Sequence, residues 1–186
     1  MTIEINNTSI KDVKLIIPAK YDDSRGFFAE TWNMNSLAEK GMNLKFVQEN
    51  HSFSYKKGTL RGLHFQKPPY SQLKLVRCGR GSLLDVFVDI RPESKTFGSW
   101  GSEVISCENR HQLIIPEGFA HGFVTLEDNT EIIYKCSKFY KPSHEVTLRF
   151  NDSVLNIDWK LDLEDFFLSE KDKNGISFSD ASNYFT

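Results

Sequence analysis

The sequence predicts an all-β fold, namely a small antiparallel barrel or jelly roll with short helices at its edges. Turn-forming residues interrupt the chain at short intervals between residues 47 and 148. The run 82–91 has apolar residues at every second position, which is typical of a strand with one buried face. Helical signals are confined to two short segments outside this region. We therefore expect no crossover helices between the strands.

The helical segments flank the predicted strands. Asn35 or Ser36 is a candidate N-cap for a helix through 37–40, and Gly41 is placed to end it. A second short helix is predicted near 162–167. Between them, the apolar even positions of the alternating run should face the core. Three further strands follow it at the spacing of a β-sandwich or barrel: Gln112–Ile115, 119–126 and 130–138.

The composition limits the organisation of the chain and its partners. The 186 residues carry 23 Lys and Arg against 25 Asp and Glu, and the net charge of −2 argues against nucleic acid and anionic membranes as main partners. We expect a single domain over residues 1–186, without a membrane span or a signal peptide. Three widely spaced cysteines favour reduced thiols and therefore a cytoplasmic location.

Two histidines on predicted strands are the first candidates for chemistry. His64 lies in the strand-like run 60–66, and strict alternation places His121 on one face with Phe119 and Phe123. A hydrogen-bonded structural histidine is one interpretation of each. An unpaired polar ring among apolar side chains is costly, however, so His121 indicates a cavity or a partner group.

The same residues lie in segments that partly match a metal-binding pattern. The Pro-x-Gly-x-x-His run that ends at His121 is the second half of a pattern that marks metal-binding cupin barrels. The first half needs a histidine two residues after His64 and then a glutamate, but the chain has Gln66 and Lys74. A neutral amide is a poor ligand and an ammonium repels a cation. We therefore expect no metal and no cofactor.

Without a metal, His64 is available as a proton acceptor, because imidazole titrates near neutral pH. Asp172 is a candidate to orient its ring, on condition that the C-terminal segment folds back onto the strands. Tyr134 shares the parity of Ile132 and Cys136 on a predicted strand. It is either a core aromatic or a phenol at the edge of a site.

Basic side chains are the remaining candidates. Arg25, Arg61 and Lys74 are either separate surface residues or one cluster at a shared mouth. The residues that would complete a pocket for a diphosphate and a flat base are Gln48, Asn50 and Tyr140. Strict alternation places Arg61 and His64 on opposite faces. A shared site would need a β-bulge near Gly62 or a rim position for Arg61.

Seven parts of the sequence together resemble a known family. In chain order they are 23–30, 48–52, Leu60–Gln66, 74–77, 85–91, 115–123, and 151–152 with Ile157 and Trp159. They are similar to the dTDP-4-dehydrorhamnose 3,5-epimerases, which are metal-free cupins. The resemblance covers nearly the whole chain, and motifs in this order are highly specific.

The resemblance implies a cupin-type double-stranded β-helix, or jelly roll, that dimerises by strand exchange. It implies epimerisation of dTDP-4-dehydro-6-deoxy-D-glucose at carbons 3 and 5 to dTDP-4-dehydro-L-rhamnose. The implied catalytic roles are general base for His64, orienting carboxylate for Asp172, proton donor from the opposite face for Tyr134 and enolate stabiliser for Lys74. The implied substrate-binding residues are Arg25, Glu30, Gln48, Glu49, Asn50, Arg61, His121, Tyr140, Glu145 and Lys171. Tyr140 would stack on the thymine, and residues 25–30 would come from the neighbouring subunit.

Two positions depart from the family's pattern. Val146 stands where glycine is common, and Lys160 where proline is common. Both affect local turns, although Val146 also follows the substrate-contacting Glu145. Two other functions stay open on the sequence. One is a single-carbon epimerase or ketoisomerase on a related dTDP-4-keto sugar, and the other is a non-catalytic cupin that binds a sugar nucleotide.

Overall fold

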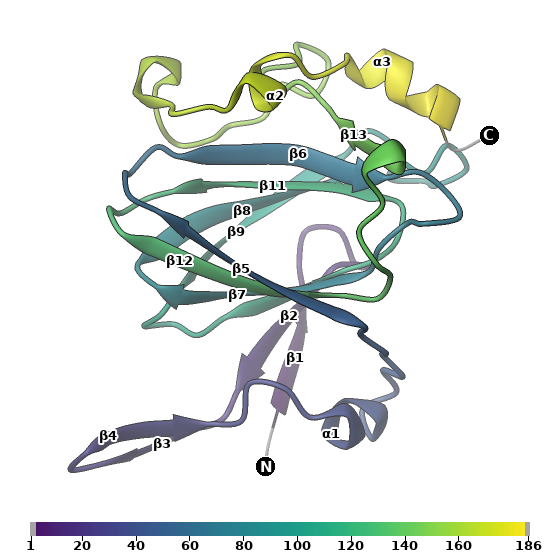
Figure 1. The fold of residues 1–186 in the computed structure, drawn as a ribbon. Coiled ribbons are helices and arrows are strands. Elements are labelled where there is room, and N and C mark those ends of the chain that lie inside the picture. Colours follow the sequence, from purple (N-terminus) through teal and green to yellow (C-terminus); the bar gives the residue numbers. More distant parts are fainter. Residues whose placement is uncertain (1–2, 185–186) are drawn as a thin grey trace.

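Two antiparallel β-sheets face each other in the computed structural model, which describes residues 3–184 (Figure 1). The six-stranded sheet has the order β1-β2-β10-β7-β12-β5, and the five-stranded sheet has the order β13-β6-β11-β8-β9. β3 and β4 form a separate hairpin. The predicted all-β jelly roll is therefore confirmed.

The strands of the six-stranded sheet are β1 (Ile3–Asn7), β2 (Lys14–Pro18), β10 (Gln112–Ile115), β7 (Lys74–Arg80), β12 (Thr130–Cys136) and β5 (Gln48–Ser54). Those of the five-stranded sheet are β13 (Glu145–Thr147), β6 (Leu60–Gln66), β11 (Phe119–Thr125), β8 (Ser82–Asp89) and β9 (Trp100–Ser106). The hairpin comprises β3 (Lys20–Asp23) and β4 (Gly26–Ala29). The helices are α1 (Met34–Ala38), α2 (Glu170–Lys173) and α3 (Phe178–Ala181), with 3-10 turns at Pro142–His144, Leu163–Asp165 and Ser182–Tyr184.

Strand β8 is buried on both faces, and the expectation of a half-buried strand over 82–91 is wrong in this respect. Its even positions pack outward against the C-terminal segment, including Trp159 and Phe178. Its odd positions face the six-stranded sheet, where Phe87 packs in the central core. Asp85 and Asp89 are fully buried on this inner face. The outer face of β8, which was expected to contact solvent, is buried because the C-terminal segment covers it.

The C-terminal segment forms this third layer over the five-stranded sheet, and Figure 1 shows α2 above β6 and α3 farther along the same side, near β13. Parallel bridges join Thr59 to Phe167 and Leu148 to Ile176, so the segment is tied to the barrel at two points. The central core lies between the sheets, and a third apolar cluster lies under α1 and the residues after it. The C-terminal residues are thereby brought to the edge of the barrel interior.

The predicted helices lie at the edges but have different bounds. α1 begins at Met34 because Asn33 caps it, with Oδ1 accepting from the backbone N–H groups of Asn35 and Ser36. The helix near 162–167 is only a 3-10 turn, and the nearby helix α2 was not predicted. α2 begins after Ser169, whose hydroxyl accepts from the backbone N–H of Asp172. Within residues 3–184, no helix has the length and apolar character needed to cross a membrane.

Candidate active site

Strand β6 directs both Arg61 and His64 into one cavity between the sheets. The register between β6 and β11 shifts by one residue between these two positions, so of the two expected alternatives the β-bulge near Gly62 is present. Gly62, with φ of +127°, lies at the shift. A Cβ there would come within 2.5 Å of the Gly122 Cα, so the close approach of β6 and β11 requires glycine.

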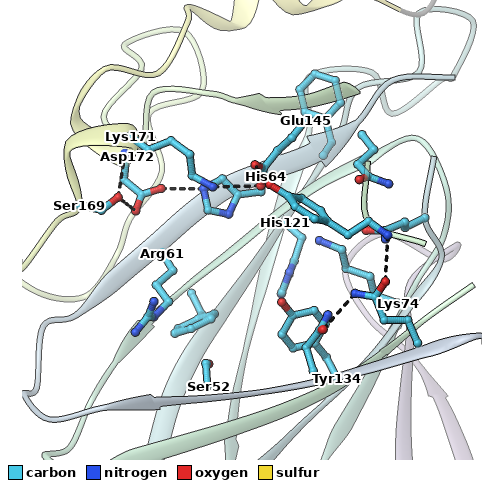
Figure 2. Close-up of a pocket in the computed structure, with 17 residues that line it drawn as sticks. Ser52, Arg61, His64, Lys74, His121, Tyr134, Glu145, Ser169, Lys171 and Asp172 are labelled. Carbon is cyan, nitrogen blue, oxygen red and sulfur yellow. Dashed lines mark hydrogen bonds and ion pairs between the residues drawn. The ribbon is translucent and has the colours of Figure 1, made fainter. Parts of the chain in front are cut away.

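The cavity has a volume of about 460 Å³, which suits a small organic ligand. Its two walls belong to different sheets (Figure 2). β6 and β11 contribute His64 and His121, while β7 and β12 contribute Lys74 and Tyr134. A ligand between the walls would therefore meet imidazole on one side and a phenol and an ammonium on the other.

His64 and Asp172 form a short hydrogen bond, with 2.6 Å between His64 Nε2 and Asp172 Oδ1. The C-terminal segment does fold back, as the pairing of these residues requires. The Ser169 hydroxyl donates to the other carboxylate oxygen at 2.6 Å, and the Gly62 N–H lies 3.3 Å from Oδ1. Asp172 is only 3% exposed, and these donors satisfy both of its oxygens.

The electrostatics keep the His64 ring neutral and the Asp172 carboxyl ionised. Burial lowers the pKa of His64 below 6.5, with the Lys171 and Lys74 charges acting in the same direction and Asp172 opposing them. Burial would raise the pKa of Asp172, but its hydrogen bonds with His64 and Ser169 outweigh burial and lower it. With Nε2–H directed at the carboxylate, Nδ1 of His64 carries the free lone pair.

Lys74 and Tyr134 occupy the opposite wall. Burial lowers the pKa of the Lys74 ammonium, although the Asp85 and Glu145 charges partly oppose it. Burial raises the pKa of the Tyr134 phenol, while a hydrogen bond with Asn50 acts in the other direction. Tyr134 therefore keeps its proton at neutral pH, and Lys74 becomes a stronger proton donor than a solvated lysine.

Three residues from separate segments meet at the mouth of the cavity. The Tyr140 hydroxyl donates to Glu145 Oε2 at 2.7 Å, and Lys171 Nζ lies 3.0 Å from Glu145 Oε1 (Figure 2). The Glu145 carboxylate raises the pKa of Tyr140 to about 12. Glu145 thus links the C-terminal segment to the loop after β12.

His121 has the partner that its apolar surroundings implied. Its Nε2 lies 2.8 Å from Asp85 Oδ2, and the Asp85 side chain is fully buried. The second Asp85 oxygen has no hydrogen-bond partner among the described residues. His121 also lines the cavity, so both alternatives raised by the sequence, a partner and a cavity, hold for it.

The cavity gathers most of the predicted site residues. Those that line it are Gln48, Asn50, Arg61, His64, Lys74, His121, Tyr134, Tyr140, Glu145, Lys171 and Asp172. Glu49 is not among them, because alternation on β5 directs it to the outer face, where it pairs with Lys135. Glu49 therefore does not line this cavity within a single chain, and its substrate-binding role stays a prediction.

Arg25 and Glu30 also lie away from the cavity of their own chain. Arg25 is on the β3–β4 hairpin, which projects from the barrel, and its guanidinium pairs with Asp23 at 2.6 Å (Figure 1). Phe27 and Phe28 on the same hairpin are exposed. Of the two alternatives raised by the sequence for Arg25, Arg61 and Lys74, a single chain does not form the cluster at one mouth, because Arg25 does not line the cavity.

Sequence reasoning missed several lining residues, among them Ser52, Gln66, Gln72 and Ser169. Ser52 follows Gln48 and Asn50 at the same parity on β5, so alternation alone pointed to it. Ser169 stands three residues before Asp172, the spacing of an N-cap with an acidic residue in the first turn. Within residues 3–184, no group of three or more His, Cys, Asp or Glu could hold a metal ion. Metal independence stays a prediction.

The fold and site define a class, the cupin-type jelly rolls whose cavity presents acid–base side chains. A family model described as dTDP-4-dehydrorhamnose 3,5-epimerase matches residues 7–180, and the chain belongs to this family. An enzyme of that name from Shigella flexneri is 47% identical over 184 residues, covering 98% of this chain and 99% of its own.

Two crystal structures support the assignment. The dTDP-4-dehydrorhamnose 3,5-epimerase from Elizabethkingia anophelis matches with a TM-score of 0.90 and 45% identity, over 96% of this chain and 97% of its own. A dTDP-6-deoxy-D-glucose-3,5-epimerase from Legionella pneumophila, in complex with dTDP-4-keto-L-rhamnose, matches with a TM-score of 0.91 and 42% identity. That match covers 96% of this chain and 94% of the other.

Proposed function

We propose that the protein epimerises dTDP-4-dehydro-6-deoxy-D-glucose at carbons 3 and 5 to give dTDP-4-dehydro-L-rhamnose. The observation that carries the proposal is the His64–Asp172 pair on one wall of a cavity whose other wall presents Lys74 and Tyr134. The Legionella structure supports it, since that relative is in complex with dTDP-4-keto-L-rhamnose. The protein is thus an isomerase of dTDP-rhamnose biosynthesis.

The first step breaks a carbon–hydrogen bond next to the C4 ketone. His64 Nδ1 takes the proton, and the bonding electrons move through the carbonyl to its oxygen, which becomes an enolate. The imidazolium formed at His64 is stabilised by the Asp172 carboxylate on Nε2. The Lys74 ammonium stabilises the enolate oxygen. This kind of stabilisation is strongest in a cavity that excludes water.

The second step returns a proton to the same carbon from the other side. Tyr134 is on β12 and His64 on β6, so the two groups approach the sugar from opposite walls. The Tyr134 O–H gives its proton to carbon as the enolate collapses to the ketone, and the configuration inverts. Exchange with solvent removes the proton from His64 and restores the one on Tyr134, which resets the site without a redox cofactor.

Isotope incorporation tests the proposal directly. Turnover of the substrate in D₂O should place deuterium at both carbons 3 and 5, because the returned proton comes from an exchanged side chain. Mass spectrometry and NMR of the product measure it, with enzyme previously dialysed against a chelator. Deuterium at one carbon would identify a single-carbon epimerase, and retention of hydrogen at both would refute the reaction. Loss of activity on dialysis would contradict metal independence.

We further propose that the active unit is a homodimer, in which the β3–β4 hairpin of one subunit completes the cavity of the other. The exposed Phe27 and Phe28 and the remote position of Arg25 support this arrangement. The substrate-contacting roles of Arg25 and Glu30 belong to this proposal. The free thiols of Cys78, Cys107 and Cys136 support a cytoplasmic location.

Subunit mixing tests the dimer. Arg25→Ala should raise KM, and His64→Ala should abolish turnover, when each variant is measured alone. After the two are denatured and refolded together, hybrid dimers contain one site with an intact His64 and an intact hairpin, so activity should recover. Sedimentation should give twice the chain mass throughout. Failure of the mixture to gain activity over its components would place Arg25 outside the partner's site.

A further inference from the structure

Gln66 stands at the position where the metal-binding pattern has its second histidine, and its side chain is fully engaged with backbone groups. Its Nε2 donates to the carbonyl of Tyr70 at 2.8 Å and to that of Phe139 at 3.3 Å. Its Oε1 accepts from the N–H of Lys141 at 2.6 Å. The residue is only 4% exposed. A buried amide with this geometry fixes the backbone it contacts.

The backbone held in this way is the segment 139–141 after β12. Its three residues are exposed, with Phe139 at 68% and Tyr140 at 49%, so little apolar packing orders it. A second glutamine holds the segment from the opposite sheet, because Gln48 Oε1 accepts from the Tyr140 N–H at 2.9 Å. One glutamine on β6 and another on β5 therefore clamp the loop between the two sheets.

The clamped segment carries Tyr140 at the cavity mouth. The family resemblance implies that this ring stacks on the thymine of the substrate, and the Tyr140 hydroxyl is hydrogen-bonded to Glu145. Gln66 lies near the mouth on the β6 side, because it is paired in the sheet with Glu145 on the adjacent strand β13. Loss of the Gln66 amide would free the backbone on both sides of Tyr140 while leaving His64 and Asp172 bonded to each other.

We propose that Gln66 is a positioning residue for nucleotide binding, which acts by holding segment 139–141 so that Tyr140 is preorganised over the mouth of the cavity. The inference rests on the proposed function for its substrate. Cupin metal sites use this position for a metal ligand. Here the position would serve binding of the nucleotide end of the substrate rather than the chemistry at the sugar. Preorganisation of this kind improves affinity because less order is lost on binding.

The test is Gln66→Met, which keeps the length of the side chain and removes the amide. KM for the dTDP-sugar and Kd for dTDP alone should both rise about 10-fold. A loss of affinity of this size matches the net contribution of one or two hydrogen bonds, here those that order segment 139–141. The value of kcat and its pH profile should stay within about twofold of the parent. Gln66→Glu keeps the acceptor for the Lys141 N–H and loses the donors, so its KM should be intermediate.

Asn109→Leu is the matched control. Asn109 makes the same number of backbone hydrogen bonds in the turn between β9 and β10, accepting from Ser106 and His111 and donating to Val104, and it does not line the cavity. The Asn109→Leu variant should unfold at a lower urea concentration than the parent, without a change in KM. An equal KM effect in this control would mean that the Gln66 result reflects general loosening of the fold.

A double-mutant cycle with Tyr140→Ala decides whether Gln66 acts through the ring. If it does, Gln66→Met should add less than twofold to the KM of Tyr140→Ala, whereas independent effects would multiply. A fall in kcat at unchanged KM, or unchanged binding of dTDP in Gln66→Met and Gln66→Glu, would overturn the inference. Absence of turnover in the parent enzyme would count against the proposed function instead, and dTDP binding would still test the clamp.

Discussion

His64→Ala is expected to lower kcat by about 100- to 10,000-fold, the range that a positioned general base contributes. Within residues 3–184, the His64 imidazole is the only one that is both bonded to a carboxylate of the C-terminal segment and open to the cavity, and the variant removes it. KM should change by less than about threefold, since the nucleotide contacts lie at the mouth. Steady-state kinetics on the dTDP-sugar measure both quantities.

The role of His64 as a base also predicts how kcat/KM changes with pH. His64 acts as a base in its neutral form, and its pKa lies below 6.5 because the ring is buried near two lysines. The value of kcat/KM should therefore be flat near neutral pH and fall only as the pH drops through the lowered pKa of His64, where the ring becomes protonated. Asp172→Asn removes the group that raises this pKa. The acidic limb should then shift to lower pH while kcat falls.

His111→Ala is the control for His64→Ala, because His111 lies in the turn before β10 and does not line the cavity. Its kinetics should match the parent within about twofold. Full turnover in His64→Ala would assign the abstraction to another group. The neighbouring His121–Asp85 pair would then be the first to examine.

The sequence predicted the strands β8, β10, β11 and β12 from apolar patterning and turn spacing, but it predicted none of the strands β1 to β4, which precede residue 30. β8 shows the limit of predicting burial from alternation, because the charged residues Asp85 and Asp89 at its odd positions are fully buried. Asp85 is hydrogen-bonded to His121, and Asp89 is paired with the Arg91 guanidinium. The Asp85–His121 pair joins residues 36 positions apart, and a period of two cannot predict a pair at that separation.

Alternation also predicted some of the residues that line the cavity, but it could not predict contacts between distant parts of the chain. Alternation on β5 distinguishes Gln48 and Asn50 from Glu49, and a motif taken as a block does not. The contact between His64 and Asp172 joins residues 108 positions apart and depends on the C-terminal segment crossing β6. No local pattern encodes that crossing. The bulge at Gly62 could be predicted only because Arg61 and His64 were both required on one face.

Tyr134→Phe is expected to lower the rate of inversion by about 100- to 10,000-fold while leaving proton abstraction in place. The change removes one oxygen and keeps the ring that packs beside the central core. His64, Asp172 and Lys74 are unaltered, so the enolate should still form. In D₂O, the recovered substrate should then gain deuterium at the carbons next to the ketone, with its configuration retained.

This outcome follows from the two walls of the cavity. A base that removes a proton can return a deuteron only to the side from which it took the proton, and His64 is confined to the β6 wall. Inversion needs a donor on the β12 wall, and Tyr134 is the phenol there. Exchange without inversion in Tyr134→Phe, together with loss of both in His64→Ala, would separate the two roles. Loss of exchange in both variants would show instead that the phenol takes part in abstraction, and the division of labour between the sheets would have to be abandoned.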